Sequence, residues 1–451
     1  MANSLEKKSM FKSVLEGIAA YTTSKILTQG VNLAAALIVI RTLSVFEYGV
    51  WQLVQSAGAI IGMLTLPYLE NIFVTDMARD LGENNPGRYR AELLSFSKII
   101  FPLSVITGIA LFFAAGLVAS WIGNDAAIPV LKIFALTFFL APIKRVYLLF
   151  FLTKAKFALE AGFQFLNRFG YLLFVLLFIS FLNYGLYGIA LAYVFSVLFP
   201  LVLFFPALIR IFFESFRVTA GDYSFIQTFK AHGKWSILND QLGVIGNLEP
   251  WIIKYFLGVE AVAIFSVALT LYSVISDLIP VEKLMRSLFP LDIADENILK
   301  FHFQQSIKYF TWLYAAMGVA AFVSMPYFIS AAFPKYLPSL FLFNLFLLRF
   351  AAIPVSSVVS AALYTLRAQK YIFFINTFKI INPFVLALLV YWFGIIGIGI
   401  SDIFLAYFLT FIRYKMVRRV EPGLVFYLKS LFRLDRTDFG YFKKLFSGSI
   451  A

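Results

Sequence analysis

The chain contains no cysteine in its 451 residues. A disulfide framework, a thiol nucleophile and a cysteine-ligated metal are therefore excluded. Charge is also scarce, because only 14% of the residues are charged, whereas about a quarter are charged in ordinary soluble domains. With 61% hydrophobic residues and a mean hydropathy of +0.85, the chain lacks the polar residues that would cover a soluble fold of this length. Lipid is therefore its main solvent.

Twelve stretches of about twenty largely apolar residues are long enough to cross a bilayer as helices. The basic segment from Met1 to Lys12 leads into an apolar stretch that continues past Lys25 without a small-residue cleavage site, so the first span does not resemble a removable signal peptide. The sequence predicts an all-α integral membrane protein. The predicted spans are 14–40, 47–69, 97–120, 129–152, 161–181, 186–211, 236–257, 260–282, 306–330, 339–364, 372–393 and 396–416.

The lysine and arginine residues of the connecting segments are concentrated on one side of the membrane. If the N-terminus is cytoplasmic, the outer connections contain only Arg41 and Lys335. This positive-inside pattern, repeated at every loop, predicts a multi-pass protein of the bacterial inner membrane with both termini in the cytoplasm. Since the sorting accounts for the net charge of +14, nucleic acid is not an expected partner. The cytoplasmic cations ahead of the tail are Lys7, Lys8, Lys12, Arg79, Arg88, Arg90, Lys154, Lys156, Arg217, Lys230, Lys234, Lys283, Arg286, Lys300, Arg367 and Lys370.

The same topology divides the chain into two six-helix lobes. Residues 1–211 form the N-terminal lobe, 212–235 a basic cytoplasmic linker and 236–416 the C-terminal lobe. A basic amphipathic tail, 417–451, interleaves aromatic and basic residues such as Phe426, Tyr427 and Lys429. This pattern favours a helix lying on the anionic inner leaflet, which makes membrane lipids an expected partner.

An internal repeat relates the two lobes. Shifts of 213 and 209 residues superimpose ordered sets of matching positions, and both copies start from the same side of the membrane. The lobes are therefore expected to be related by a pseudo-two-fold axis along the membrane normal, and in such transporters the substrate site lies between the halves. The matches are Gly30 with Gly243, Glu47 with Glu260, Pro67 with Pro280, Asn167 with Asn376, Gly185 with Gly394 and Gly188 with Gly397.

Ionisable side chains within the spans are the candidate functional residues, because charge in a bilayer is costly and usually faces a cavity or a partner. A structural ion pair, a hydrogen bond into an unwound turn or snorkelling near a helix end is the alternative for each. The candidates for ligand binding are Lys25, Arg168, Arg349 and Lys379, and those for ion coupling are Glu249 and Asp240.

The repeat narrows this set. In the repeat, Lys25 corresponds to Leu238. Glu249 lies eleven positions after Leu238, so on a regular helix its side chain points to within about 20° of the same face. The two positions differ in depth by about 16 Å. Gln29 and Asn32 lie on the same stripe as Lys25, whereas Asp240 points nearly opposite. We expect a cavity with a cation toward the cytoplasmic side and a carboxylate farther out.

No cofactor or metal site is predicted. The glycines between Gly394 and Gly399 have a spacing similar to that of a nucleotide-binding motif, but no predicted strand precedes them, as that motif requires. Both histidines, His232 and His302, fall in predicted cytoplasmic loops without metal-ligand spacing.

Three short motifs resemble those of the polysaccharide-type (Wzx-like) flippases of the multidrug/oligosaccharidyl-lipid/polysaccharide (MOP) exporter superfamily. The first is Gln29-Gly30-Val31-Asn32 leading to Arg41-Thr42-Leu43 and Glu47-Tyr48-Gly49-Val50-Trp51. The second runs from Asn183 to Ala190, and the third is Phe333-Pro334-Lys335-Tyr336. The resemblance extends over the whole chain, including its length, its twelve spans and its repeat.

The resemblance implies two lobes that alternate between inward and outward openings and move an undecaprenyl-pyrophosphate-linked oligosaccharide from the inner to the outer leaflet. It implies a cationic cavity for the pyrophosphate and sugars, a coupling proton or sodium ion, and polysaccharide polymerase machinery as a neighbour. Lys25 and Arg349 suit the pyrophosphate, and Glu249 suits the coupling ion.

Three rival functions remain open on sequence, one of which is a lipid scramblase or a non-transporting scaffold of the same fold. A drug or small-solute antiporter of the same fold would favour an acidic, aromatic cavity, against which the intramembrane cations argue. A membrane polysaccharide polymerase or ligase would carry a large external loop with Arg and His, which this chain lacks. We therefore predict a transporter and not an enzyme.

Overall fold

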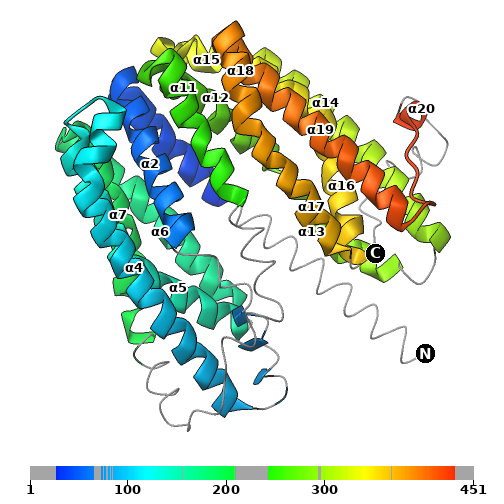
Figure 1. Cartoon of the computed structure of the whole chain (residues 1–451), viewed down its shortest axis with the longest axis horizontal. Helices are drawn as coiled ribbons and strands as arrows, with labels where there is room; N and C mark the ends of the chain where they lie inside the picture. The colour runs from blue at the N-terminus through cyan, green and yellow to red at the C-terminus, as the bar shows by residue number, and fades with distance from the viewer. Residues whose placement is uncertain are drawn as a thin grey trace. The chain divides into compact units, whose positions relative to one another are not determined.

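The computed structural model describes residues 27–431, with gaps at 66–72, 75, 78–79, 82, 84, 155, 208, 210–241, 293–295 and 367. Within these ranges the chain is helical and contains no strand (Figure 1). The predicted site residues Lys25 and Asp240, the linker 212–235 and the tail residues 432–451 lie outside the described residues.

Every predicted span coincides with helix where its residues are described. The first half contains helix Leu27–Thr42, α2 (Val45–Thr65), α4 (Pro86–Ile122), α5 (Ala127–Thr153), α6 (Phe157–Val175), the π-helical η1 (Leu176–Phe181) and α7 (Gly185–Leu203). The second half contains η3 (Leu242–Leu248), α11 (Glu249–Leu257), α12 (Val259–Ser276), α13 (Val281–Asp292), α14 (Glu296–Ala332), η4 (Pro334–Tyr336), α15 (Ser339–Leu347), η5 (Leu348–Ala351), α16 (Ala352–Thr365), α17 (Gln369–Thr377), η6 (Phe378–Ile381), α18 (Asn382–Phe393), α19 (Ile395–Val420) and α20 (Leu428–Leu431).

Nine helices of the described part of the chain are long and apolar enough to cross a membrane. The other three predicted spans coincide with the shorter apolar helix Leu27–Thr42, with α2, and with η3 followed by α11. The all-α, twelve-span membrane architecture is confirmed.

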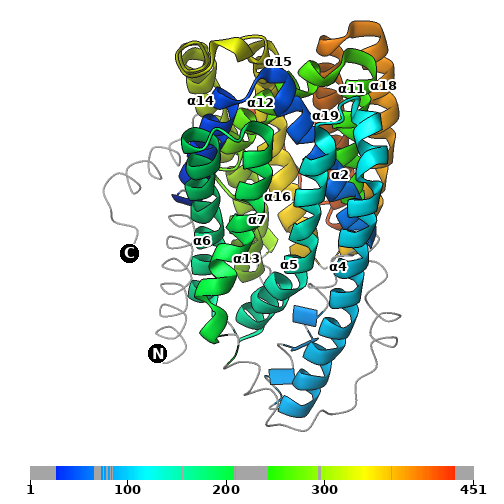
Figure 2. The same cartoon turned by 90° about the vertical axis from the view of Figure 1, so that its left-hand side faces the viewer.

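The described residues pack into two compact units. One draws on Met1–Ile279, Val323–Phe346 and Asn376–Leu405, and the other on Pro280–Phe322, Leu347–Ile375 and Ala406–Ala451. In the first unit α4 packs along α5 and α6 along α7 (Figure 2), and α2 packs along α12. In the second unit α13 packs along α16. The division into lobes at residues 212–235 stays a prediction.

Helix α4 shows why helices extend beyond the predicted spans. It has 37 residues and is therefore about 55 Å long, whereas the hydrocarbon core is about 30 Å thick. The Asn85 side chain caps its start by accepting a hydrogen bond from the Arg88 N–H, and Pro86 occupies the first turn. Gly123, with φ of 79°, ends it in a left-handed turn. Hydropathy detects only the part from residue 97 onward, because the capped first turns are polar.

Two glycine pairs predicted from the repeat have similar surroundings in the structure. Gly185, the first residue of α7, and Gly394, immediately before α19, both have positive φ, 53° and 58°. A Cβ on Gly188 would lie 2.9 Å from the Phe178 carbonyl oxygen, and one on Gly397 would lie 2.1 Å from the Leu389 carbonyl oxygen. Each half thus turns into its last helix through a left-handed glycine and packs that helix through a second one, which supports the repeat.

Gly49 of α2 allows close packing against α12, and its replacement should destabilise the fold. A Cβ there would lie 2.2 Å from the Val259 carbonyl oxygen, so Gly49→Ala should cost about 1–3 kcal/mol through overpacking. Gly116→Ala is the matched control, because nothing lies within 4 Å of its Cβ position in α4. Thermal unfolding in detergent should show a lower midpoint for Gly49→Ala and an unchanged or higher one for Gly116→Ala. Equal midpoints would contradict the close contact.

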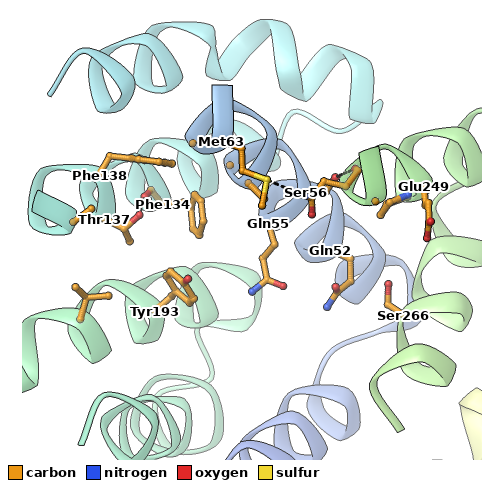
Figure 3. Close-up of a pocket in the computed structure, with 18 of the residues that line it drawn as sticks. Gln52, Gln55, Ser56, Met63, Phe134, Thr137, Phe138, Tyr193, Glu249 and Ser266 are labelled. Carbon is orange, nitrogen blue, oxygen red and sulfur yellow. Dashed lines mark hydrogen bonds between the residues drawn. The ribbon is translucent and has the colours of Figure 1, made fainter. Parts of the chain in front are cut away.

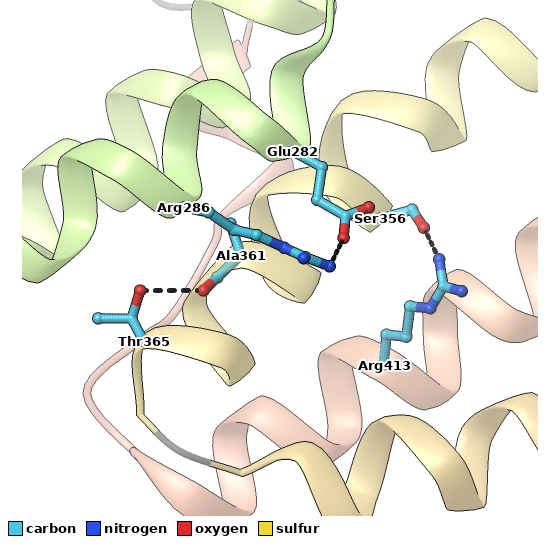
Figure 4. Close-up of polar contacts among 6 residues, drawn as sticks. All are labelled: Glu282, Arg286, Ser356, Ala361, Thr365 and Arg413. Atoms are coloured by element: carbon cyan, nitrogen blue, oxygen red, sulfur yellow. Dashed lines mark hydrogen bonds and ion pairs between the residues drawn. The ribbon is translucent and has the colours of Figure 1, made fainter. Parts of the chain in front are cut away.

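The second unit contains a polar cluster that joins α13, α16 and α19 (Figure 4). Arg286 pairs with Glu282 one turn before it, and its guanidinium lies 3.3 Å from the centre of the Tyr364 ring. Arg413 donates a hydrogen bond to the Ser356 hydroxyl. These contacts give both cations partners within the second unit, so we assign the cluster a structural role.

Candidate functional site

Three candidate site residues of the second half lie in a 3₁₀ segment or directly after one. Glu249 directly follows the 3₁₀ segment η3, Arg349 lies in η5, and Lys379 lies in η6. A proline occupies the first turn of the α-helix after each 3₁₀ segment. Proline has no backbone N–H, so it cannot donate a hydrogen bond to the preceding turn. These prolines are Pro250, Pro354 and Pro383. Ionisable side chains therefore accompany the 3₁₀ segments of these spans.

The 3₁₀ geometry corrects one premise of the sequence argument. We placed Lys25 and Glu249 on one face by assuming a rotation of about 100° per residue from Leu238 onward. Residues 242–248 form a 3₁₀-helix, which rotates by about 120° per residue, so over these seven residues the direction of Glu249 changes by about 140° relative to that assumption. Because Lys25 lies outside the described residues, the shared face stays an untested prediction.

A cavity of about 540 Å³ lies within the first unit (Figure 3). Its walls come from α2, α5 and α7 of the first half of the chain and from η3, α11 and α12 of the second half. The volume is in the range of small-molecule sites, about 300–1,000 Å³. The polar and charged lining residues are Gln52, Gln55, Ser56, Thr137, Lys144, Arg145, Tyr193, Asn247, Glu249, Ser266 and Thr270.

Two cations of α5 form one wall of the cavity. Lys144 and Arg145 both line it, and Lys144 Nζ donates a hydrogen bond to Asn167 Oδ1 at 3.3 Å. Asn167 is buried and is fixed in turn by donating to the Ser196 carbonyl oxygen at 2.6 Å. The positive charges of Arg168 and Arg145 lie close enough to Lys144 to repel it. Such a cluster of like charges in an apolar span is stabilised by an anion.

A carboxylate lies on the wall from the second half. Glu249 Oε1 accepts a hydrogen bond of 2.7 Å from the Asn382 side chain. Asn382 Oδ1 accepts one of 3.3 Å from the Ser401 hydroxyl, and both of these residues are buried. The chain of oxygens joins α11, α18 and α19. Nearby, the Ser56 hydroxyl of α2 donates to the Asn247 carbonyl oxygen at 2.5 Å, which links the two halves across the break before Pro250.

The structure brings together only part of the predicted site. Glu249 lines the cavity, and exposed Arg168 lies beside the cationic wall. Gln29 and Asn32, in helix Leu27–Thr42, are half-buried and do not line it. Lys379 in the first unit and Arg349 in the second are half-buried at their 3₁₀ segments and do not line it either. Their roles stay predictions.

Sequence reasoning missed Lys144 and Arg145 although a signal was present. Both lie within the predicted span 129–152, directly after Pro142 and Ile143, and meet the same criterion of charge inside a span as the chosen candidates. The amide partners Asn167, Asn247 and Asn382 were not detectable as site residues, because neutral amides are common in helices of this kind. Among the described residues no group of His, Cys, Asp and Glu is arranged to hold a metal ion.

The chain matches a family profile described as "Polysaccharide biosynthesis protein" over residues 95–340. The match covers more than half of the sequence and includes α5, α7, α11 and α12, which line the cavity. No curated protein matches the chain.

Solved structures share the fold. An inward-facing multidrug resistance MATE family transporter of the MOP superfamily is 13% identical, with a TM-score of 0.74 over 88% of this chain and 95% of that one. The lipid II flippase MurJ, in an inward closed conformation, is 13% identical, with a TM-score of 0.69 over 97% of this chain and 93% of that one. A MATE protein in complex with MaD3S is 15% identical, with a TM-score of 0.62 over 89% and 94%. At these identities the likeness establishes the fold.

Proposed function

Because the chain belongs to the polysaccharide biosynthesis protein family and has the fold of MOP superfamily transporters, we propose that it is a flippase for lipid-linked oligosaccharide. Its substrate is an undecaprenyl-pyrophosphate-linked repeat unit of O-antigen, capsule or exopolysaccharide, moved from the inner to the outer leaflet. The protein moves this molecule without changing it chemically and without a cofactor.

The observation that carries the proposal is the cationic wall of the cavity. Lys144 and Arg145 present positive charge beside the amides and hydroxyls of α2. A pyrophosphate offers the oxygen acceptors that such cations bind through short, charge-assisted hydrogen bonds. The neutral polar groups suit the first sugar, and the lipid tail stays in the bilayer, since a cavity of about 540 Å³ holds only part of such a molecule.

The carboxylate of Glu249 supplies the ion-coupling step in this proposal. A coupling proton neutralises it, or a sodium ion binds it in place of the hydrogen bond from the Asn382 amide. Because the group lies at the start of α11, directly after a 3₁₀ segment, its charge state is placed to alter the bend of that span.

The drug-antiporter alternative shares this fold. It predicts an acidic cavity, whereas here two cations of α5 face one carboxylate of α11. The discriminating experiment is deletion of the gene. We expect lipid-linked glycan to accumulate on the cytoplasmic face of the membrane. Normal surface glycan together with sensitivity to cationic dyes would replace the flippase by the antiporter.

Single cysteines in this naturally cysteine-free chain test the topology. An impermeant thiol reagent should label Asn124→Cys, Tyr184→Cys and Lys335→Cys from outside intact cells, because these positions belong to the predicted outer connections. It should leave Asn85→Cys, Asp222→Cys and Asn297→Cys unlabelled until the cells are opened. Reversed labelling at two of the six positions would contradict the twelve-span topology with cytoplasmic termini.

A further inference from the structure

A second pocket lies in the first unit where three connections meet. We call it the connection pocket; its volume is about 750 Å³. It is formed by Glu47 at the start of α2, by the α4–α5 connection at Asn124, and by residues 183–187 where α7 begins. In contrast to the cavity, the described residues that line it include no lysine or arginine. It therefore offers no positive charge to a phosphate group.

Two tyrosines form an aromatic surface on this pocket. Asn183 and Gly185 both have left-handed backbones, with φ of 54° and 53°, so the chain reverses sharply and starts α7. Tyr184, the N-cap residue of α7, and Tyr187 in its first turn both line the pocket. One face of the Tyr184 ring stacks on Phe178, with centroids 6.3 Å apart and planes at 13°. The two side chains remain 48% and 43% exposed, so their other surfaces are available to a ligand.

Planar polar groups surround these rings. Glu47 Oε2 accepts a hydrogen bond of 2.9 Å from the Ser44 N–H, and Oε1 lies toward Gly185, 3.6 Å from where a Cβ would be. Asn124 Oδ1 accepts from the Ala126 N–H at 3.0 Å, which leaves the Asn124 NH₂ group as a donor. The other described residues offer no hydrogen bond to the Asn183 amide. The pocket thus presents donors and acceptors from one carboxylate and two amides.

The charge of Glu47 is already offset inside the protein. Lys335 lies close enough to attract it electrostatically, while the Lys335 ammonium itself donates to the Arg41 and Leu43 carbonyl oxygens. A cationic ligand would therefore gain little from the pocket. A neutral sugar fits the arrangement, because its C–H face packs on an aromatic ring and its hydroxyls hydrogen-bond to amides and carboxylates.

We propose that the connection pocket binds a neutral sugar of the transported glycan, apart from the cavity that takes the pyrophosphate. The inference rests on the proposed function for the origin of that sugar. Both pockets use α2: Glu47 begins the helix, and Gln52 lines the cavity about 7.5 Å further along the axis. By the predicted topology the connection pocket is on the outer side, so it would hold the glycan as it leaves.

Protection of a single cysteine from labelling tests the site. Ala126→Cys places a thiol on the pocket wall, and Glu260→Cys, at the exposed start of α12, is the matched control. Purified protein in lipid nanodiscs is labelled with a maleimide in the presence of chitobiose, maltose or lactose, or of osmotically matched betaine. At a sugar concentration of about twice its Kd, labelling of Ala126→Cys should slow about threefold, and that of Glu260→Cys should not change.

Two variants distinguish binding from mere exposure. Tyr184→Ala with Tyr187→Ala removes the aromatic surface, and Asn183→Gly removes an amide while allowing the left-handed backbone. Each should abolish the protection. Protection by none of the three sugars, or protection that survives in folded variants, would overturn the inference and leave the tyrosines as anchors at the membrane surface. Glycolipid flipping by the same Ala126→Cys protein is measured in parallel. Flipping without protection refutes only the pocket, and protection without flipping refutes the proposed function.

Discussion

Replacing Lys144 and Arg145 together by glutamine should reduce glycolipid transport by at least about a hundredfold. Each cation is expected to supply a hydrogen bond between charged groups worth about 1.5–3 kcal/mol, and the loss of two amounts to about 3–6 kcal/mol of substrate binding. The amide side chains retain polarity but carry no charge. Transport is measured with purified protein in vesicles, at matched amounts of inserted protein.

Two controls separate binding from folding. Arg419→Gln removes an exposed cation near the end of α19 and should leave transport unchanged. Exchanging the two cations, as Lys144→Arg with Arg145→Lys, keeps the charge and should retain most of the activity. Normal transport by the double glutamine variant would show that the cationic wall does not hold the substrate.

Glu249→Gln should abolish the stimulation of transport by an ion gradient. The glutamine oxygen can still accept the hydrogen bond from Asn382, so the packing of α11 against α18 is kept while the charge is lost. Coupling free energies of about 1–3 kcal/mol correspond to changes of about 5–150-fold, so the rate of gradient-driven transport should decrease by a factor in that range. Binding of the glycolipid without a gradient should persist. The measurement is the transport rate with imposed proton or sodium gradients and without them.

The matched control for this variant is Glu260→Gln, which neutralises an exposed carboxylate in the first turn of α12. It should respond to the gradient as the wild type does. A Glu249→Gln protein that remains equally stimulated would mean that the ion binds elsewhere. If the Glu249→Gln protein fails to insert into the membrane, Glu249 has a structural role. The ion coupling is then tested with Asn382→Asp, which can supply a carboxylate at the same place.

The membrane architecture could be predicted from the sequence because its signals are additive. Apolar stretches of span length and the sorting of lysine and arginine recur along the whole chain, and one wrong helix count would scramble the sorting. The glycine matches also held, since Gly185 and Gly394 must adopt a backbone that other residues disfavour. Helix ends such as Pro86 were missed because capped polar turns carry no hydropathy signal.

The type of cavity could be predicted from the sequence, but most of the residues that line it could not. A cationic wall and a carboxylate were expected between the halves, but the cations that line it are Lys144 and Arg145. Assigning faces with a constant 100° per residue fails at η3, where the backbone is 3₁₀-helical, and no periodicity rule reveals such a break in advance. Asn382 could not be paired with Glu249 from sequence, because their contact joins residues 133 positions apart.

The family motifs also had a meaning that the sequence did not reveal. Glu47, Tyr184 and Lys335 come from three separate motifs, yet the structure gathers them at one end of the first unit. The Tyr48 and Tyr336 rings meet edge to face at 6.0 Å in the same region. Residues that share a short motif pattern thus hold connections together and line the connection pocket, whereas the cavity is built from residues outside those motifs.

The flippase proposal is tested most directly by reconstitution of the purified chain in vesicles. A fluorescent undecaprenyl-pyrophosphate oligosaccharide is incorporated into both leaflets, and a glycosidase that cannot cross the membrane is added outside. Protein-free vesicles should protect about half of the glycolipid, and vesicles that contain the wild-type protein should expose nearly all of it, whereas those with the Lys144→Gln and Arg145→Gln protein should resemble the protein-free ones. If wild-type vesicles protect as much glycolipid as protein-free vesicles under either ion gradient, yet transport a cationic dye, the chain is a solute antiporter and the flippase proposal is wrong.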